Sequence, residues 1–259
     1  MDGQNPYSPP VTSVDPPAGA SYQGLAVRYE PGAGRATASI VLLYIAAAVE
    51  LLGALGSVYT IVIMGRVRQG GVTGADALAL GVVGVGDAVL TLVVRIGCAI
   101  AFSMWFYRVY RNLLAFGFST TYTPGWAPGS FYVPFLNLVR PYQIAREIWI
   151  ICAPTVIEPA GPGVPSATGE VSSPQQGHGL VSGWWALFLG SNIVATIGSR
   201  MSGETPDSVQ VMNGIFIVAS LLSIGAAFAC VKMINGIEER QAGCARQQQG
   251  PEAQDMYAR

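Results

Sequence analysis

The stretch Thr37–Gly65, TASIVLLYIAAAVELLGALGSVYTIVIMG, contains one charged residue, Glu50. About 20 apolar residues are enough for a helix to cross a bilayer, so this stretch predicts a transmembrane helix over about 38–65. Three further apolar runs predict transmembrane helices over about 77–115, 180–199 and 209–236. The sequence therefore predicts an all-α, polytopic integral membrane protein whose membrane domain covers 37–236.

The composition of the whole chain agrees with this fold class. Its 259 residues are 51% hydrophobic and 11% charged, whereas about 25% are charged in an ordinary soluble domain. The mean hydropathy is +0.42. A net charge of -1 provides no basic face for nucleic acid. Lys232 is the only lysine among the 14 basic residues, a bias typical of bacteria with GC-rich genomes.

The segments outside the four helices differ in character. Residues 1–36 are rich in proline and predict a disordered tail, either a solvated leader or a ligand for a proline-binding partner. Prolines divide 124–153 into pieces too short to span, which predicts an interfacial segment that ends in an amphipathic helix with Ile144 and Ile148 on its apolar face. We expect a flexible loop over 154–179 and a polar tail over 237–259.

The distribution of basic residues predicts the orientation. Four crossings place both termini on one side, and the side with more Arg and Lys is the cytoplasmic one. The side of the termini holds Arg28, Arg35, Arg108, Arg111, Arg140, Arg146, Lys232, Arg240, Arg246 and Arg259, and the other side holds Arg66, Arg68 and Arg200. We therefore expect an inner-membrane protein with a cytoplasmic N-terminus and C-terminus.

A set of aromatic and proline motifs resembles a known family. The motifs are Trp105-Phe-Tyr-Arg108-Val-Tyr-Arg-Asn112, Gly125-Trp126, Gly129-Ser-Phe-Tyr-Val-Pro134, Asn137, Pro141, Ile148-Trp149 and Trp184-Trp185. Together they resemble, over about 40–236, a bacterial membrane-protein family described as a domain of unknown function and numbered four-three-two-eight. The resemblance implies a four-helix membrane domain and brings no activity, ligand or catalytic residue.

The same motifs suggest an interfacial site. Arg108 and Asn112 share a helix face, and with Asn137 they could bond carbonyls that the prolines leave free. Indole rings favour the membrane interface, where we expect all five tryptophans to lie. The alternatives are a structural cap or contacts to a lipid headgroup or another anion, made by Trp105, Arg108, Arg111, Asn112, Trp126 and Asn137.

Three charges interrupt the apolar helices and need partners there. Counting back from a turn near residue 71 places Glu50 level with about residue 93 of the next helix, so we expect an ion pair with Arg95. Asp87 lies about 12 Å from Arg95 along the helix, too far to pair, and should stay hydrated near the outer interface. The pair could hold the helices in register or mark an ion path.

The sequence points away from catalysis. His178 is the only histidine and the four cysteines lack C-x-x-C spacing, so no catalytic centre, metal site or cofactor site is expected. The preferred interpretation is a non-catalytic membrane module that binds lipid or a partner, with the N-terminal tail as one docking segment. The alternative is an oligomeric transporter or channel for small solutes or ions that uses Glu50, Asp87 and Arg95, and either interpretation allows a homo-oligomer.

Overall fold

The computed structural model describes residues 28–71, 73–152 and 178–248. The described chain is all-α. Four helices are long and apolar enough to cross a membrane, as the sequence predicts. They are α1 (Ala33–Arg68), α2 (Gly74–Ala115), α5 (His178–Ser199) and α6 (Pro206–Gln248), and shorter helices α3 (Trp126–Gly129), η1 (Leu136–Leu138) and α4 (Arg140–Ile151) lie between α2 and α5 in the chain.

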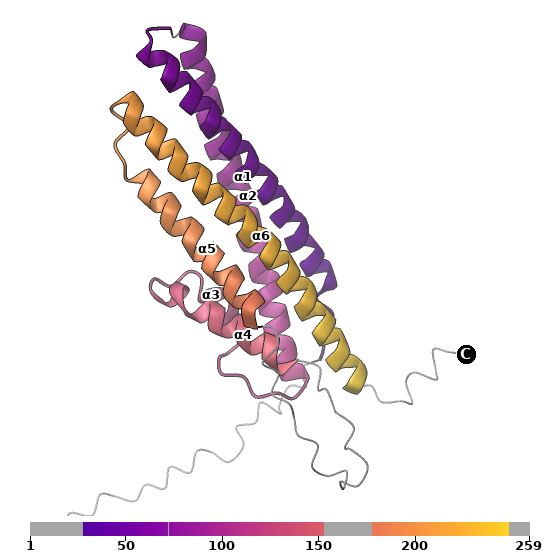
Figure 1. Ribbon diagram of the computed structural model, residues 1–259. Helices are drawn as coiled ribbons and strands as arrows, with labels where there is room; N and C mark the ends of the chain where they lie inside the picture. Colours follow the sequence, from indigo (N-terminus) through magenta and orange to yellow (C-terminus); the bar gives the residue numbers. More distant parts are fainter. Residues whose placement is uncertain (1–27, 72, 153–177, 249–259) are drawn as a thin grey trace, which may run out of the picture.

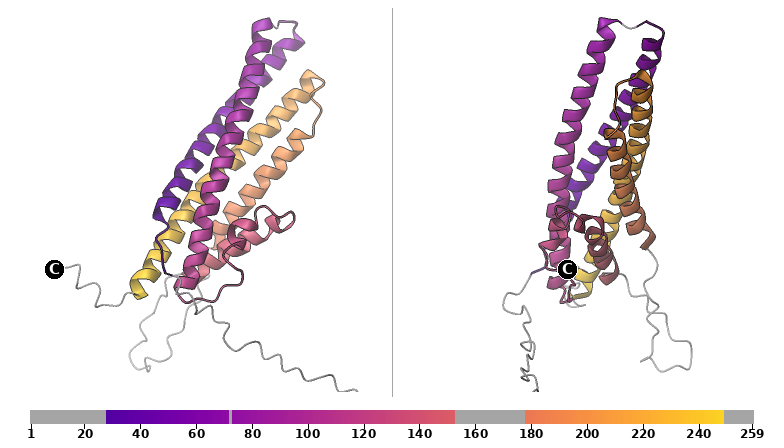
Figure 2. Two further views of the ribbon diagram at one scale, coloured as in Figure 1. Left: turned by 180° about the vertical axis from the view of Figure 1, so that it is seen from behind. Right: turned by 90° about the vertical axis from the view of Figure 1, so that its left-hand side faces the viewer.

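The long helices form two antiparallel hairpins that pack through α1 and α6. Helix α1 packs extensively on α6, while α2 packs on α1 and α5 packs on α6. The two outer helices, α2 and α5, therefore stand on either side of an α1–α6 centre. Figures 1 and 2 show the short helices gathered at the end of the bundle where the described chain begins and ends.

Local sequence explains how α2 begins and ends. At its start, Thr73 and Asp76 cap each other: the Asp76 N–H donates to Thr73 Oγ1 over 3.2 Å and the Thr73 N–H donates to Asp76 Oδ2 over 2.9 Å. At its end, Gly117 adopts a φ of +82°, a left-handed conformation that suits glycine. The chain can then turn back toward the bundle.

The segment over 117–152, which we call the cap, contains α3, η1 and α4. Its prolines break the chain into short pieces, as expected. The apolar face of α4 packs on protein: Ile144, Ala145 and Ile148 are at most 1% exposed in the core shared with α2, α5 and α6. The expected amphipathic helix is therefore present, and the bundle covers its apolar face.

Both expected tails are partly helical in the residues that the structure describes. Helix α1 begins at Ala33, inside the tail expected over 1–36. Helix α6 continues to Gln248, through most of the polar tail expected over 237–259, because Ile237 and Gln241 are 1% and 2% exposed against the rest of the protein. The proline-rich residues 1–27 and most of the loop expected over 154–179 lie outside the described residues.

Candidate functional site

A cavity of about 370 Å³ opens between the two outer helices, α2 and α5. Helices α1 and α6 form its inner wall, and the cap closes one end. Its lining residues are Leu43, Ala46, Glu50, Arg95, Cys98, Ala99, Phe102, Ser103, Phe131, Tyr132, Trp184, Phe188, Ser191, Asn192, Ser223, Ala226, Ala227 and Cys230. These residues lie along the apolar part of the helices, and the space opens sideways between α2 and α5. We therefore call it the lateral cavity.

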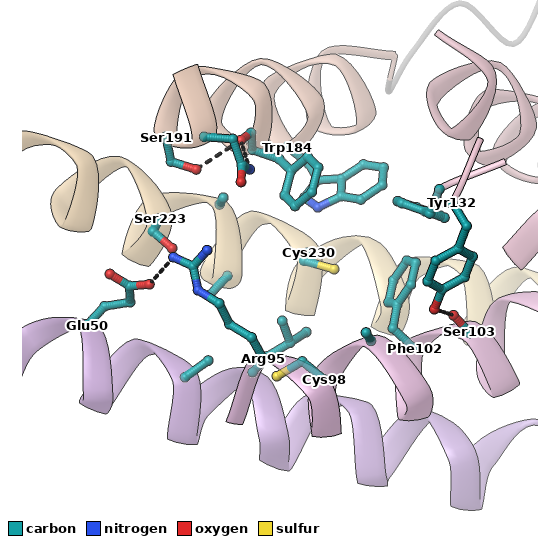
Figure 3. Close-up of a pocket in the computed structure, with 18 residues that line it drawn as sticks. Glu50, Arg95, Cys98, Phe102, Ser103, Tyr132, Trp184, Ser191, Ser223 and Cys230 are labelled. Atoms are coloured by element: carbon teal, nitrogen blue, oxygen red, sulfur yellow. Dashed lines mark hydrogen bonds and ion pairs between the residues drawn. The ribbon is translucent and has the colours of Figure 1, made fainter. Parts of the chain in front are cut away.

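An ion pair lies at one end of the lateral cavity. Arg95 Nη2 donates to Glu50 Oε1 over 2.9 Å, which brings together the two residues expected to pair. Ser220 Oγ on α6 donates to the other carboxylate oxygen over 3.0 Å. The Glu50 side chain is 15% exposed and that of Arg95 is 55% exposed. Figure 3 shows the guanidinium group between Glu50 and the α6 residue Ser223.

The other end of the lateral cavity is aromatic. Phe102 on α2 lies 5.7 Å from Phe131 of the cap and 6.0 Å from Trp184 on α5, between ring centroids. The hydroxyl groups of Ser103 and Tyr132 are 3.0 Å apart and tie the cap to α2 at the rim. The site thus combines one charged pair with a largely apolar body, which is the usual make-up of a ligand pocket.

Asp87 lies against α1 and is half-buried. Gly53 makes this possible, since a Cβ atom there would stand 3.0 Å from Asp87 Oδ1. The hydration of Asp87 near the outer interface stays a prediction. Asp87 does not line the lateral cavity. The three intramembrane charges therefore do not form one cluster: Glu50 and Arg95 pair, and Asp87 uses the space that a glycine leaves.

Two residues expected to contact lipid are buried in the core. Trp105 is fully buried, and its Nε1–H donates to Glu238 Oε1 over 2.8 Å. Asn112 is 1% exposed, and its Nδ2 group donates over 3.0 Å to the Glu30 carbonyl and over 3.0 Å to Gln241 Oε1. Neither side chain can reach a headgroup or the carbonyls near the prolines, so these expectations are wrong.

Most of the other tryptophans are also buried in the protein. Trp149, Trp184 and Trp185 are at most 7% exposed and belong to the core, whereas Trp126 is 37% exposed. Arg140 of the cap lies 4.6 Å from the Trp126 ring centroid, a cation–π contact. Indole serves here mainly to dock helices.

The remaining interface candidates have different surroundings. Arg108 forms an ion pair with Glu30, which lies just before α1. Arg111 and Asn137 are half-buried on α2 and in the cap. A second hollow is lined by Arg35, Ser103, Met104, Tyr107, Arg108 and Pro128. It lies beside the start of α1 and combines two guanidinium groups with an exposed tyrosine.

Two polar residues that tie the cap and α6 to α2, Glu147 and Gln241, were absent from the sequence-based list. Glu147 accepts from Tyr110 Oη over 2.9 Å and from the Thr121 N–H over 2.7 Å, and so fixes the start of the cap. Gln241 Nε2 donates to the Val109 carbonyl over 2.7 Å. The helical spacing of Ile234, Ile237 and Gln241 past the end of the apolar run could have revealed the continuing buried face.

In the part of the chain that the structure describes, no three His, Cys, Asp or Glu side chains gather in a way that could hold a metal ion. The described cysteines are free thiols, and Cys98 Sγ donates to the Leu42 carbonyl over 3.3 Å. The lateral cavity offers hydrogen bonding from Arg95 and from the polar side chains Ser103, Tyr132, Ser191, Asn192 and Ser223, together with a larger apolar surface.

Comparison with known proteins identifies the family. The model of the family described as "Domain of unknown function (DUF4328)" matches residues 65–239. This match includes α2, the cap, α5 and most of α6. The chain belongs to this family. No curated protein and no solved structure matches the chain.

Proposed function

We propose that this DUF4328 member is a non-catalytic module of the bacterial inner membrane that binds a lipid or a similar amphiphile in the lateral cavity. The observation that carries the proposal is a cavity of about 370 Å³ that opens between α2 and α5, on the face where the bundle meets hydrocarbon. Ligand sites typically span about 300–1,000 Å³ and are mostly apolar with a few placed polar groups. A molecule dissolved in the bilayer could enter sideways without passing through water.

The test fills the cavity from a position with room for a larger side chain. Ala99 lines the cavity and is exposed, so Ala99→Phe should occupy it without disturbing the helix contacts. Ala88→Phe, on the same helix, exposed and outside the cavity, is the matched control. Native mass spectrometry of the purified protein should show equal lipid occupancy in the wild type and in Ala88→Phe, and lower occupancy in Ala99→Phe. Equal lipid occupancy in all three would overturn the proposal.

A second lipid contact is proposed at the hollow beside α1. Arg35 and Arg108 both line it, and Glu30 neutralises only one positive charge, so an anionic headgroup would be attracted. The Arg35→Ala, Arg108→Ala double variant should retain less anionic phospholipid after purification, while zwitterionic lipid stays unchanged. Identical retention of anionic lipid would count against this contact.

Orientation and partners are further parts of the proposal. The excess of basic residues on the side of the termini supports cytoplasmic ends, and a reporter fused after Arg259 that is active only outside the cytoplasm would contradict it. The N-terminal tail is proposed to recruit a proline-binding protein. Affinity capture should compare the full chain with a variant lacking residues 1–27, because Glu30 contacts Arg108 and should be kept.

Transport is the second candidate. All four long helices contribute a polar side chain near the middle of the bundle: Glu50, Arg95, Ser191 and Ser220. Polar groups at this depth often mark ion or proton paths. Purified protein in liposomes should then support a proton or small-ion flux that Glu50→Gln abolishes. Flux equal to that of empty liposomes would leave the binding module as the function.

A further inference from the structure

Arg95 has more hydrogen-bond donors than the protein satisfies. A guanidinium group carries five N–H donors, whereas in the described chain Arg95 bonds Glu50 and has one further hydroxyl, that of Ser223, beside it. The Arg95 side chain is 55% exposed and lines the lateral cavity. Glu50 lies near the middle of the apolar run Thr37–Gly65, so water is scarce there. Unpaired donors are costly in hydrocarbon, which favours an occupant that supplies an acceptor.

The charges around Arg95 restrict that occupant to a neutral molecule. Glu50 already balances the guanidinium charge and also accepts from Ser220. An added anion would leave a net negative charge deep in hydrocarbon, with Asp87 as a further acid in the same part of the bundle. An added cation would compete with Arg95 for Glu50. A neutral acceptor satisfies the free N–H groups and leaves the ion pair intact.

The rest of the lateral cavity determines the body of the occupant. Beyond Cys98 its walls are mostly apolar, formed by Ala227 and the rings of Phe102, Trp184 and Phe188. The hydroxyl groups of Ser103 and Tyr132 also line this end, where they bond to each other over 3.0 Å. These surfaces offer contact to a chain or a flat ring and few hydrogen bonds. The occupant is therefore apolar over most of its length, with its acceptor at one place.

From these observations we infer that the lateral cavity binds a neutral, carbonyl-bearing apolar molecule, such as an ester or a ketone, whose oxygen accepts a hydrogen bond from Arg95. This inference rests on the proposed lipid-binding function and narrows it to a chemical class. Neutral amphiphiles of this kind dissolve in the bilayer interior, so they can reach Arg95 from between α2 and α5.

Three matched probes test the class: a brominated fatty acid, its methyl ester and the corresponding bromoalkane. Bromine quenches indole fluorescence at short range, and Trp184 is the tryptophan that lines the cavity. Saturable quenching that disappears in Trp184→Phe isolates binding in the cavity. The ester should bind at least about tenfold more tightly than the acid or the alkane, since a hydrogen bond from a charged donor is worth about 1.5–3 kcal/mol.

The variant Arg95→Lys keeps the charge opposite Glu50 but has three donors in place of five. It should weaken ester binding about tenfold and leave alkane binding unchanged. If the Arg95→Lys variant fails to fold, a second measurement uses the wild type. The infrared carbonyl stretch of an isotope-labelled ester should shift to lower frequency when the ester binds. An unshifted stretch, or equal affinity of wild type for the three probes, overturns the inference while cavity binding stands. Absence of saturable, Trp184-dependent quenching by all three probes overturns the proposed function as well.

Discussion

Arg95 Nη2 lies 2.9 Å from Glu50 Oε1 and joins α2 to α1 at the level where Ser220 of α6 donates to the same carboxylate. Three helices thus meet through one acidic group. Either residue alone would be an isolated charge in hydrocarbon, so the pair is the polar centre of the bundle.

The charge-swapped variant Glu50→Arg, Arg95→Glu should therefore be more stable than either single variant. Interhelical polar contacts in membranes contribute about 1–2 kcal/mol, so we expect a coupling free energy of that size from thermal unfolding in detergent. The Ser220 hydroxyl can accept from a guanidinium group introduced on α1 as readily as it donates to the Glu50 carboxylate. A double variant no more stable than the worse single variant would show that the two residues are not coupled.

Trp105→Phe should destabilise the protein through Glu238. The substitution keeps the ring in the core but removes the 2.8 Å hydrogen bond to Glu238 Oε1. Glu238 is half-buried, so the loss of this bond should cost about 1 kcal/mol, the low end of the range for an unsatisfied acceptor. Trp126→Phe is the control, because Trp126 is 37% exposed and Phe keeps a ring for Arg140 to contact. Equal melting temperatures for the two variants would show that the hydrogen bond from Trp105 to Glu238 does not stabilise the protein.

Tyr110→Phe should loosen the start of the cap. Tyr110 Oη donates to Glu147 over 2.9 Å and accepts from the Tyr122 N–H over 2.9 Å, so one hydroxyl group holds two segments. Amide hydrogen exchange over 118–123 should become faster by about tenfold, the equivalent of about 1.4 kcal/mol. Tyr107→Phe, on the same helix but exposed, should leave that exchange unchanged.

Gly236→Ala should push the cap away from α6. A Cβ atom at Gly236 would stand 2.8 Å from two ring carbons of Trp149. Arg240 Cζ lies 3.9 Å from the centroid of the same ring. Overpacking of this kind costs about 1–3 kcal/mol. Gly214→Ala, on the same helix with no atom within 4 Å of the new Cβ, should be neutral or slightly stabilising. Thermal unfolding of the two variants compares them directly.

The rate at which the Cys152 thiol is labelled should show whether the cap is docked against the bundle. It is 2% exposed, and burial, followed by its hydrogen bond with Cys244, raises the pKa of the Cys152 thiol. Because only the thiolate reacts, labelling with a maleimide at pH 7 should be slow and should accelerate as the pH rises toward that higher pKa. Mass spectrometry can locate the label, and the half-buried Cys244 gives the internal comparison. Gly236→Ala should speed labelling of Cys152, and equal rates in wild type and variant would contradict the docking role of Gly236.

The four spanning helices could be predicted from sequence because hydrocarbon imposes a simple rule of length and polarity. The pairing of Glu50 with Arg95 could be predicted for a related reason: once a short turn joins two antiparallel helices, residue counting fixes which positions are level. Neither prediction needs any side-chain packing.

The core at the cap could not be predicted in the same way. A tryptophan beside an apolar run suits both the membrane interface and a protein core, and sequence alone does not separate the two for Trp105 or Trp184. The partners of Asn112 are Glu30 and Gln241, which are 82 and 129 positions away. Contacts of that separation follow from how helices pack, which the apolar pattern leaves open.

Helix α5 contains 22 residues, or about 33 Å at 1.5 Å per residue, while the other three long helices have 36 to 43. The hydrocarbon core is about 30 Å thick, so α5 spans it with little to spare and sets the bilayer thickness that the protein tolerates. In a thicker, sterol-rich bilayer the ends of α5 would be drawn into hydrocarbon, and hydrophobic mismatch would act on the wall that carries Trp184.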